Sequence, residues 1–183
     1  DTFSSRGLGD VYKRQLDLHN KIDITTIFVT HDQEEANAMS SNLAIFNEGI
    51  VQQVGKPVNL YNNPANTFVA NFLGTTNVIE GEIKDLIFTS KKGLIIKNIN
   101  KNAKGDSILL RPQNLYLESK NEKFEKFVGN VKSQEFLGNI VRYIVNIKDH
   151  LLILDTLHEA DKKIYSLNEE ITFYIDAEKI KFL

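Results

Sequence analysis

A single histidine, His31, lies where an apolar stretch of the sequence meets a predicted helix. Residues 26–30 are mostly β-branched or aromatic and have no helical period, which favours a strand buried on both faces in a parallel sheet. Asp32 and Glu35 have the spacing of a capping box, with their carboxylates near the positive end of the helix dipole. His31 is therefore predicted at the carboxyl end of a strand, where open α/β sheets bind ligands. Taken alone, a histidine at such a place is more often an ordinary hydrogen-bonded polar residue.

The elements that must position His31 are predicted from local patterns. In chain order they are the end of an amphipathic helix carrying Leu16, Leu18 and Ile22, a strand at 25–30, a helix over 33–40, strands at 43–46 and 50–54 joined by a turn at 47–49, and helices over 57–61 and 64–73. The last helix should carry Phe68, Val69, Phe72 and Leu73 on one side and end at Gly74. That helical spacing predicts a core face and not a base-stacking platform.

The pattern changes at residues 75–77, after which short alternating runs follow one another. Strands are predicted at 78–84, 86–89, 94–97, 107–111, 115–118, 127–136, 140–147, 151–154 and 170–175. Many short strands separated by turn residues predict a small antiparallel barrel or sandwich.

Composition limits the class of protein. The 183 residues carry a net charge of -2, and the chain contains no cysteine. There is therefore no basic excess for nucleic acid or anionic lipid, and disulfides and thiolate metal sites are excluded. No run approaches the ~18 apolar residues of a membrane span, and the first residues lack the features of a secretory signal. These features predict a soluble cytoplasmic protein.

Residues 1–15 fit none of these patterns. Gly7 and Gly9 suggest a phosphate loop, but no strand precedes them and no Gly-Lys-Ser or Gly-Lys-Thr follows. We therefore expect an unassigned leader, foreign or disordered, at 1–15.

The segment around His31 resembles the switch-histidine region of ATP-binding cassette (ABC) ATPases. Gln33, Glu34, Glu35, Ala36 and Met39 follow His31 in the order found in the importer subfamily. The run NEGIVQQVGKPVNLYNNPANTFVANFLG at 47–74 resembles the end of the importer nucleotide-binding domain almost residue for residue. Ser41 and Asn42 depart from the Asp and Arg common in the family. The resemblance implies that His31 contacts the γ-phosphate of ATP and helps to hold the attacking water, as phosphoryl transfer requires.

The second half of the chain resembles the TOBE accessory domain, a barrel similar to oligonucleotide-binding folds. IleLeuLeuArgProGlnAsnLeu at 108–115 is similar to its Arg-Pro strand, and PheLeuGlyAsnIleValArgTyr at 136–143 to its strand, Gly turn, strand element. In such a domain Arg111 is a candidate for a regulatory partner or anion contact, although an Arg before a Pro at a strand end is more often structural.

The expected fold is thus an α/β remnant, the C-terminal part of a P-loop nucleotide-binding domain, over 16–75, followed by an all-β OB-like TOBE barrel over 76–183. The resemblance implies the C-terminal fragment of an ABC importer ATPase subunit that uses ATP and Mg when intact. It further implies a homodimer that drives two membrane-spanning permease subunits fed by a solute-binding protein, at the cytoplasmic face of the membrane as a peripheral subunit. The substrate class most similar is polyamine or ferric iron, with sugars less so.

The family's phosphate loop, signature loop and catalytic Glu are not found in the chain, so no hydrolysis is expected from it alone. A noncatalytic module that binds a small oxyanion or a regulatory partner through the barrel is the alternative. A single-strand nucleic-acid binder is a third, disfavoured because the chain lacks a basic excess and a run of aromatics. His158, Glu159 and Asp161 could form a metal cluster, but three polar residues in one turn are usually a solvated tip, and no metal site is predicted.

Overall fold

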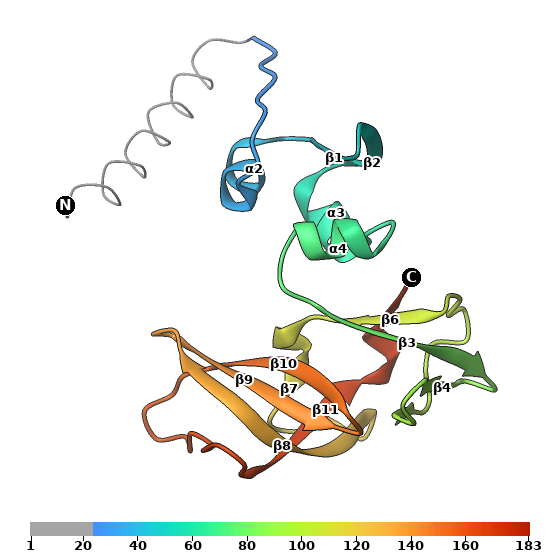
Figure 1. The fold of residues 1–183 in the computed structure, drawn as a ribbon, viewed down its shortest axis with the longest axis vertical. Helices are drawn as coiled ribbons and strands as arrows, with labels where there is room; N and C mark the ends of the chain where they lie inside the picture. The colour runs from blue at the N-terminus through green and yellow to red at the C-terminus, as the bar shows by residue number, and fades with distance from the viewer. Residues whose placement is uncertain (1–23) are drawn as a thin grey trace.

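The computed structural model describes residues 24–183, which are mostly β-structure (Figure 1). The predictions for residues 1–15 and for the helix carrying Leu16, Leu18 and Ile22 lie outside the described residues. The described chain begins with an extended segment, a helix, a hairpin and two further short helices. It continues into a β domain of two antiparallel sheets.

Residues 24–30 form no strand, contrary to the prediction for 25–30. Ile27 and Val29 are 90% and 91% exposed, and Ile24 and Phe28 are also more than half exposed. A β-branched run becomes a strand only when neighbouring strands take up its backbone hydrogen bonds and cover its faces, and every strand pair in residues 24–183 lies elsewhere and is antiparallel. The parallel sheet of the predicted α/β remnant is therefore not present in the described residues.

Helix α2 (Gln33–Met39) confirms the predicted helix to within one residue. Its N-cap is Asp32, whose Oδ1 accepts the backbone N–H groups of Glu34 at 2.8 Å and Glu35 at 3.1 Å. These bonds satisfy two of the donors that a helix leaves unpaired at its first turn. The cap was readable from the sequence because it is formed within four residues.

The predicted hairpin is also confirmed, as β1 (Leu43–Asn47) and β2 (Ile50–Gly55). Glu48 and Gly49 form its turn with φ of 50° and 77°, the left-handed backbone that a two-residue hairpin loop requires. The expectation that 43–46 is a buried strand is wrong for most of it, since only Ile45 is buried and Phe46 is 59% exposed. One face of the hairpin packs on the helices that follow, and no second layer covers the other among the described residues.

Helices α3 (Pro57–Asn62) and α4 (Thr67–Phe72) pack together beside the hairpin. Helix α4 begins after an Asn66 cap, whose Oδ1 accepts the Val69 N–H at 3.0 Å, and not at Pro64 as predicted. Val69 and Leu73 join Ile45 and Leu60 in a small core, and Phe72 packs against it. Phe68 instead stacks on Phe72 from outside, with ring centroids 6.3 Å apart, so the four predicted residues do not share one face.

The β domain contains the two five-stranded sheets. One has the order β10-β9-β8-β11-β7 and the other β12-β6-β3-β4-β5. Their strands are β3 (Asn77–Lys84), β4 (Ile87–Ser90), β5 (Ile95–Ile96), β6 (Ser107–Leu110), β7 (Leu115–Tyr116), β8 (Phe124–Phe136), β9 (Ile140–Ile147), β10 (His150–Leu157), β11 (Glu170–Asp176) and β12 (Lys181–Phe182). All nine predicted strands are present, and β12 is a tenth strand that was not predicted.

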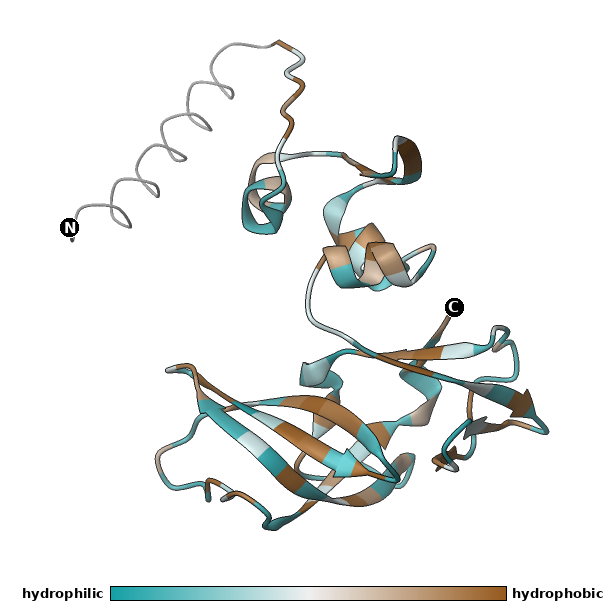
Figure 2. Ribbon diagram, in the orientation of Figure 1, coloured by the Kyte–Doolittle hydropathy of each residue, from teal (hydrophilic) through white to brown (hydrophobic). Residues whose placement is uncertain are grey.

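The core of this domain lies between the inner faces of the sheets. Side chains alternate between buried and partly exposed along β9, and Figure 2 shows the same alternation of brown and teal along the strands of the curled sheet. Phe88 from one sheet and Phe173 and Tyr143 from the other are among its largest fully buried side chains. This arrangement agrees with the all-β second domain expected from the sequence.

One buried side chain joins the two sheets directly. Asn77 of β3 donates through Nδ2 to the carbonyl oxygens of Leu110 at 3.1 Å and Ile153 at 2.8 Å, and its Oδ1 accepts the Ile153 N–H at 2.7 Å. The amide thus pairs with the edge strand β10 as a backbone peptide would. The Asn77 side chain therefore takes up the backbone N–H and carbonyl of Ile153, to which another strand could otherwise pair.

Candidate functional site

His31 is exposed and lies between the extended segment and α2. Its neighbours fix the backbone on both sides. The Thr30 hydroxyl oxygen accepts the Asp32 N–H at 3.0 Å, and the same hydroxyl donates to the Glu35 carboxylate. The chain from Thr30 to Asp32 is therefore tied to the first turn of the helix, and the imidazole extends from a backbone held at both of its flanks.

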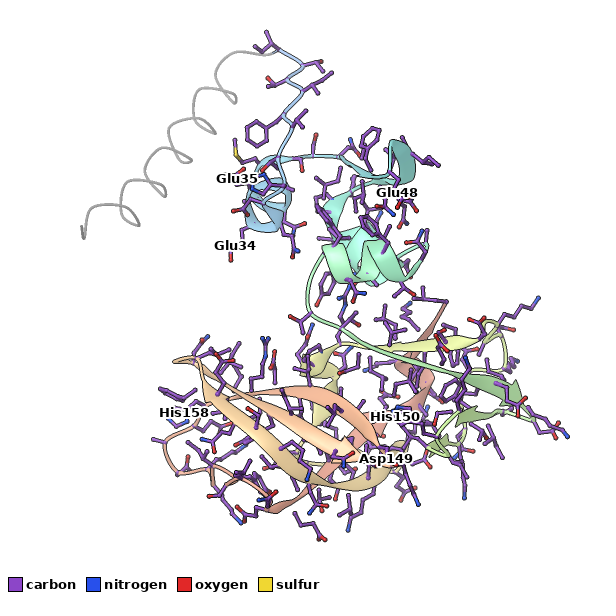
Figure 3. The ribbon with its side chains drawn as sticks, in the orientation of Figure 1. Glu34, Glu35, Glu48, Asp149, His150 and His158 are labelled. Atoms are coloured by element: carbon purple, nitrogen blue, oxygen red, sulfur yellow. The ribbon has the colours of Figure 1, made fainter. Side chains whose placement is uncertain are left out.

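This arrangement differs from the capping box read from the sequence. In a capping box the Glu35 carboxylate would accept the Asp32 N–H itself. Here the Thr30 hydroxyl stands between the two groups and connects them. Glu34 and Glu35 are the acidic residues of the first turn, as expected, and both are labelled on α2 in Figure 3.

Arg111 lies at the other functional position predicted from the sequence, at the end of β6. It is only 4% exposed. Its Nη1 donates to the carbonyl oxygens of Ala70 at 3.0 Å, Gly74 at 2.9 Å and Thr75 at 3.2 Å, and its Nη2 to that of Tyr61 at 3.2 Å. The guanidinium is thus bound to the C-terminal ends of α3 and α4, where the helix dipole favours a cation.

The aromatic ring of Tyr61 covers the same guanidinium, with the Arg111 Cζ 4.0 Å from the ring centroid. Burial lowers the pKa of Arg111, although the group stays a cation at any physiological pH. The buried Nε has no partner in the structure. The partners of Arg111 are carbonyl oxygens of its own chain, and the predicted contact with an anion or regulatory partner stays a prediction.

The two predicted site residues lie in different parts of the molecule. His31 precedes α2, whereas Arg111 follows β6 on the far side of helices α3 and α4 (Figure 1). The fold therefore does not combine them into one centre.

The histidine in the β domain with the most specific environment was not singled out from the sequence. The His150 Nε2 lies 2.8 Å from the Ser90 hydroxyl oxygen, which also accepts the Leu94 N–H at 2.8 Å. Burial first, and then the charge of Lys92, lower the pKa of His150. Lys92 also donates to the Asp149 carbonyl at 2.7 Å. Sixty residues separate Ser90 from His150, so no local signal indicates the contact.

The remaining polar groups give no metal centre within residues 24–183, where no three His, Asp or Glu side chains converge. His158 packs edge-on against the Phe136 ring, with centroids 5.0 Å apart, and Glu159 pairs with Lys162 at 2.9 Å. An open hollow of about 250 Å³ lies elsewhere in the β domain, and Lys104 and Lys181 are its ionisable lining residues. No helix in the described part of the chain is long and apolar enough to cross a membrane.

Comparison with known proteins gives relatives of one kind. No protein-family model matches the chain. It is 36% identical over 136 residues to the Fe(3+) ions import ATP-binding protein FbpC of Fusobacterium nucleatum, and this match covers 72% of this chain and 36% of the relative. It is 37% identical over 147 residues to the spermidine/putrescine import ATP-binding protein PotA of Clostridium acetobutylicum, and this match covers 76% of this chain and 41% of the relative. It is 35% identical over 161 residues to the PotA protein of Spiroplasma citri, and this match covers 84% of this chain and 45% of the relative. The chain thus matches less than half the length of these relatives.

Proposed function

We propose that this chain, a homologue of the ATP-binding subunits of ABC importers, is the C-terminal part of such a subunit. In this proposal the β domain is the TOBE-type accessory domain, over 76–183, and residues 16–75 complete a nucleotide-binding domain. The intact subunit hydrolyses Mg·ATP as a homodimer and drives solute uptake through two permease subunits supplied by a solute-binding protein. It works from the cytoplasmic face of the membrane as a peripheral subunit. The first candidate substrates are ferric iron and polyamines, because the relatives are named as import proteins for Fe(3+) ions and for spermidine and putrescine.

The exposed segment before His31 is the observation that carries this proposal. Ile27 and Val29 are about nine-tenths exposed in a sequence built for a strand buried on both faces. Such a run requires neighbouring strands, and the relatives are more than twice as long as the matched part of this chain. We assign those strands, together with the phosphate loop, the Mg-binding acids and the catalytic Glu, to a segment upstream of this chain.

His31 supports the same proposal by its surroundings. Its side chain is exposed, and its backbone is held by the Thr30 hydroxyl and the cap of α2. An imidazole held in this way can donate a hydrogen bond to a phosphate oxygen or orient a water, and either role stabilises charge that develops during phosphoryl transfer. ATP and Mg supply the reacting phosphoryl group and its charge neutralisation when they are bound to the intact subunit.

The experiment compares the 183-residue chain with the protein encoded by the complete reading frame. We expect Mg-dependent ATP hydrolysis from the intact protein and none from the chain alone. In the intact protein, His31→Ala should lower kcat by roughly 10²–10³-fold, as expected for loss of a preorganised donor. His158→Ala, a histidine change in the β domain, is the control and should leave kcat unchanged. Robust turnover by the isolated chain, or full activity of the His31→Ala protein, would contradict the proposal.

One observation favours the alternative function, a small-anion module in the β domain. The only ionisable side chains that line the open hollow are the cations Lys104 and Lys181, in a chain of net charge -2. Calorimetry of the chain with molybdate, sulfate and phosphate tests this alternative. Saturable heat that is lost in a Lys104→Met, Lys181→Met chain would favour it, whereas no heat with any of the three anions would leave the transport subunit as the sole proposal.

A further inference from the structure

Two turns of the β domain, one from each sheet, lie against each other. Residues 91–94 connect β4 to β5 in one sheet, and residues 148–149 connect β9 to β10 in the other. Lys148 and Asp149 have φ of 48° and 58°, the left-handed backbone of a two-residue hairpin turn, and the Lys148 side chain is exposed. His150 follows this turn directly, and Figure 3 labels it beside Asp149 at the end of the curled sheet. Side chains that are distant in the sequence therefore meet here.

Ser90, the last residue of β4, makes the first contact between the two turns. Its hydroxyl oxygen accepts the Leu94 N–H at 2.8 Å, and its own N–H donates to the Leu94 carbonyl at 2.8 Å. The same hydroxyl oxygen lies 2.8 Å from the His150 Nε2. Ser90 and Leu94 are only 4% and 3% exposed, so the hydroxyl needs partners within the protein. Ser90 thus closes its own turn and joins it to β10.

Lys92 makes the second contact, and it also brings a charge to the histidine. Its Nζ donates to the Asp149 carbonyl at 2.7 Å. Burial first, and then Lys92, lower the pKa of His150, whereas the Asp149 carboxylate raises it. Lys91, the other lysine of this turn, is paired with Glu80 of β3. The two lysines of one turn therefore differ in what they face.

The proton on the imidazole decides whether the two contacts are favourable. An Nε2 without a proton accepts the Ser90 hydroxyl proton, and the hydroxyl oxygen keeps a lone pair for the Leu94 N–H. A protonated Nε2 is a donor, so the Ser90 hydroxyl must turn its proton away from this acceptor in a buried place. The imidazolium also adds a second positive charge beside Lys92. Both effects act against the closed arrangement.

We infer that Ser90, Lys92 and His150 form a proton-operated latch, in which a neutral His150 holds the 91–94 turn against the 148–149 turn and a protonated His150 releases it. Because the closed latch lowers the pKa of the imidazole, the open latch binds the proton more tightly. A falling pH therefore shifts the balance toward the open latch.

The release is local. Asn77 joins β3 to Ile153 of β10 by two hydrogen bonds that involve no titrating group, and both sheets share one hydrophobic core. The sheets therefore stay together while the 91–94 turn moves away from His150. The inference depends on neither ATP hydrolysis nor transport, because each contact that carries it lies within residues 77–153.

Amide hydrogen exchange of the 183-residue chain, followed by NMR from pH 8 to pH 5, tests the latch. After correction for the intrinsic exchange rate, we expect the protection of the Leu94 amide to fall by about tenfold for each pH unit below the pKa of His150, as for release linked to one proton. The amides of β9 should stay more strongly protected at every pH. Exchange at Leu94 should also change little in low urea, which is the mark of a local opening, whereas exchange in β9 should follow global unfolding.

Four variants assign the effect to the named groups. His150→Gln removes the titrating group, so the fall in protection at low pH should disappear. Lys92→Met removes the neighbouring charge, so the fall should begin at a higher pH, nearer the ordinary value of about 6.5. Lys91→Met is the matched control on the same turn and should leave this pH unchanged, because Lys91 faces Glu80. His158→Gln is the matched histidine control and should keep the fall.

Three results would overturn the inference. One is a wild-type chain whose Leu94 amide keeps the same protection from pH 8 to pH 5. A second is a His150→Gln chain with the same fall in protection as the wild type. The third is Leu94 exchange at pH 5 with the urea dependence of β9, which would mean that acid unfolds the whole domain. If His150→Gln does not fold, Lys92→Met decides, because it keeps the imidazole, and an unmoved pH of release would contradict the latch.

Discussion

The guanidinium of Arg111 lies 4.0 Å from the centroid of the Tyr61 ring, and it donates to the backbone carbonyl oxygen of that same residue at 3.2 Å. One residue of α3 therefore holds Arg111 through both its side chain and its backbone. Because Tyr61 is near the end of its helix and Arg111 is at the end of a strand, the pair joins the end of α3 to the end of β6.

The first prediction concerns the stability that this pair contributes. Arg111→Met should lower the free energy of unfolding by about 2–3 kcal/mol, since four carbonyl oxygens lose a charged donor in a buried place. Tyr61→Phe keeps the ring and removes only the hydroxyl bond to Gln113, so it should cost about 1 kcal/mol or less. Urea unfolding followed by circular dichroism measures both. Equal costs for the two changes would show that the guanidinium contributes no more than the single hydrogen bond between Gln113 and the Tyr61 hydroxyl.

A second prediction concerns the closure of the β domain by Asn77. Asn77→Ala should destabilise the domain by roughly 2–3 kcal/mol, because the N–H and carbonyl of Ile153 lose their partner. Asn77→Asp should be worse at neutral pH, since a carboxylate would face two carbonyl oxygens. The control is Asn130→Ala, an exposed amide on β8. Exposure of the β10 edge should also promote association, which analytical ultracentrifugation detects.

Whether a feature could be predicted from the sequence depended on how many residues separate the groups that are in contact. The Asp32 cap, the Glu48-Gly49 turn and the alternation of β8–β11 are local, and each was predicted. The Asn77–Ile153 contact spans 76 residues, and the Ser90–His150 contact spans 60. No spacing rule indicates such pairs, because their distance is set by how the two sheets pack. The prediction of a strand at 25–30 was wrong for a related reason. Its sequence favours a strand, but no neighbouring strand pairs with it among residues 24–183.

A third prediction is the pH dependence of folding. The pKa of His150 is lowered in the folded chain by burial and by Lys92, so the unfolded chain binds the proton more readily. The contribution to stability is then complete above the ordinary pKa of about 6.5 and decreases as the pH falls below it. Unfolding free energies at a series of pH values from 8 to 5 measure the slope. His150→Gln should remove this part of it, and Lys92→Met should make it shallower. An unchanged slope in His150→Gln would refute the assignment.

A fourth prediction concerns the exposed residues before His31. In the isolated chain, Ile27→Lys should leave the unfolding free energy of the β domain unchanged and should improve solubility, because the side chain is 90% exposed. In the intact subunit the same change should destabilise by several kcal/mol, since it buries an unpaired charge in a sheet. Thermal unfolding of both proteins gives the comparison, with Glu48→Lys in the hairpin turn as control. The same small effect in both proteins would remove the main support for an upstream sheet.

A fifth prediction isolates the group that holds the backbone around His31. Thr30→Val removes the hydroxyl that links Asp32 and Glu35, so the Asp32 amide should exchange its hydrogen faster. Thr30→Ser should restore slow exchange. Glu34→Ala removes a carboxylate from the same helix turn without touching this hydroxyl, and therefore controls for the helix dipole. Equal exchange rates in the Thr30→Val and wild-type chains would show that the cap of α2 alone holds this backbone.

The bonds of Arg111 to helices α3 and α4 also bear on how such a chain can change in evolution. Arg111 binds backbone oxygens, which every amino acid supplies, so most side chains of α3 and α4 can be substituted without loss of these bonds. The requirements that remain are an aromatic ring at position 61 and helix ends at the same places. The Arg111 bonds therefore constrain where α3 and α4 end more than which residues these helices contain.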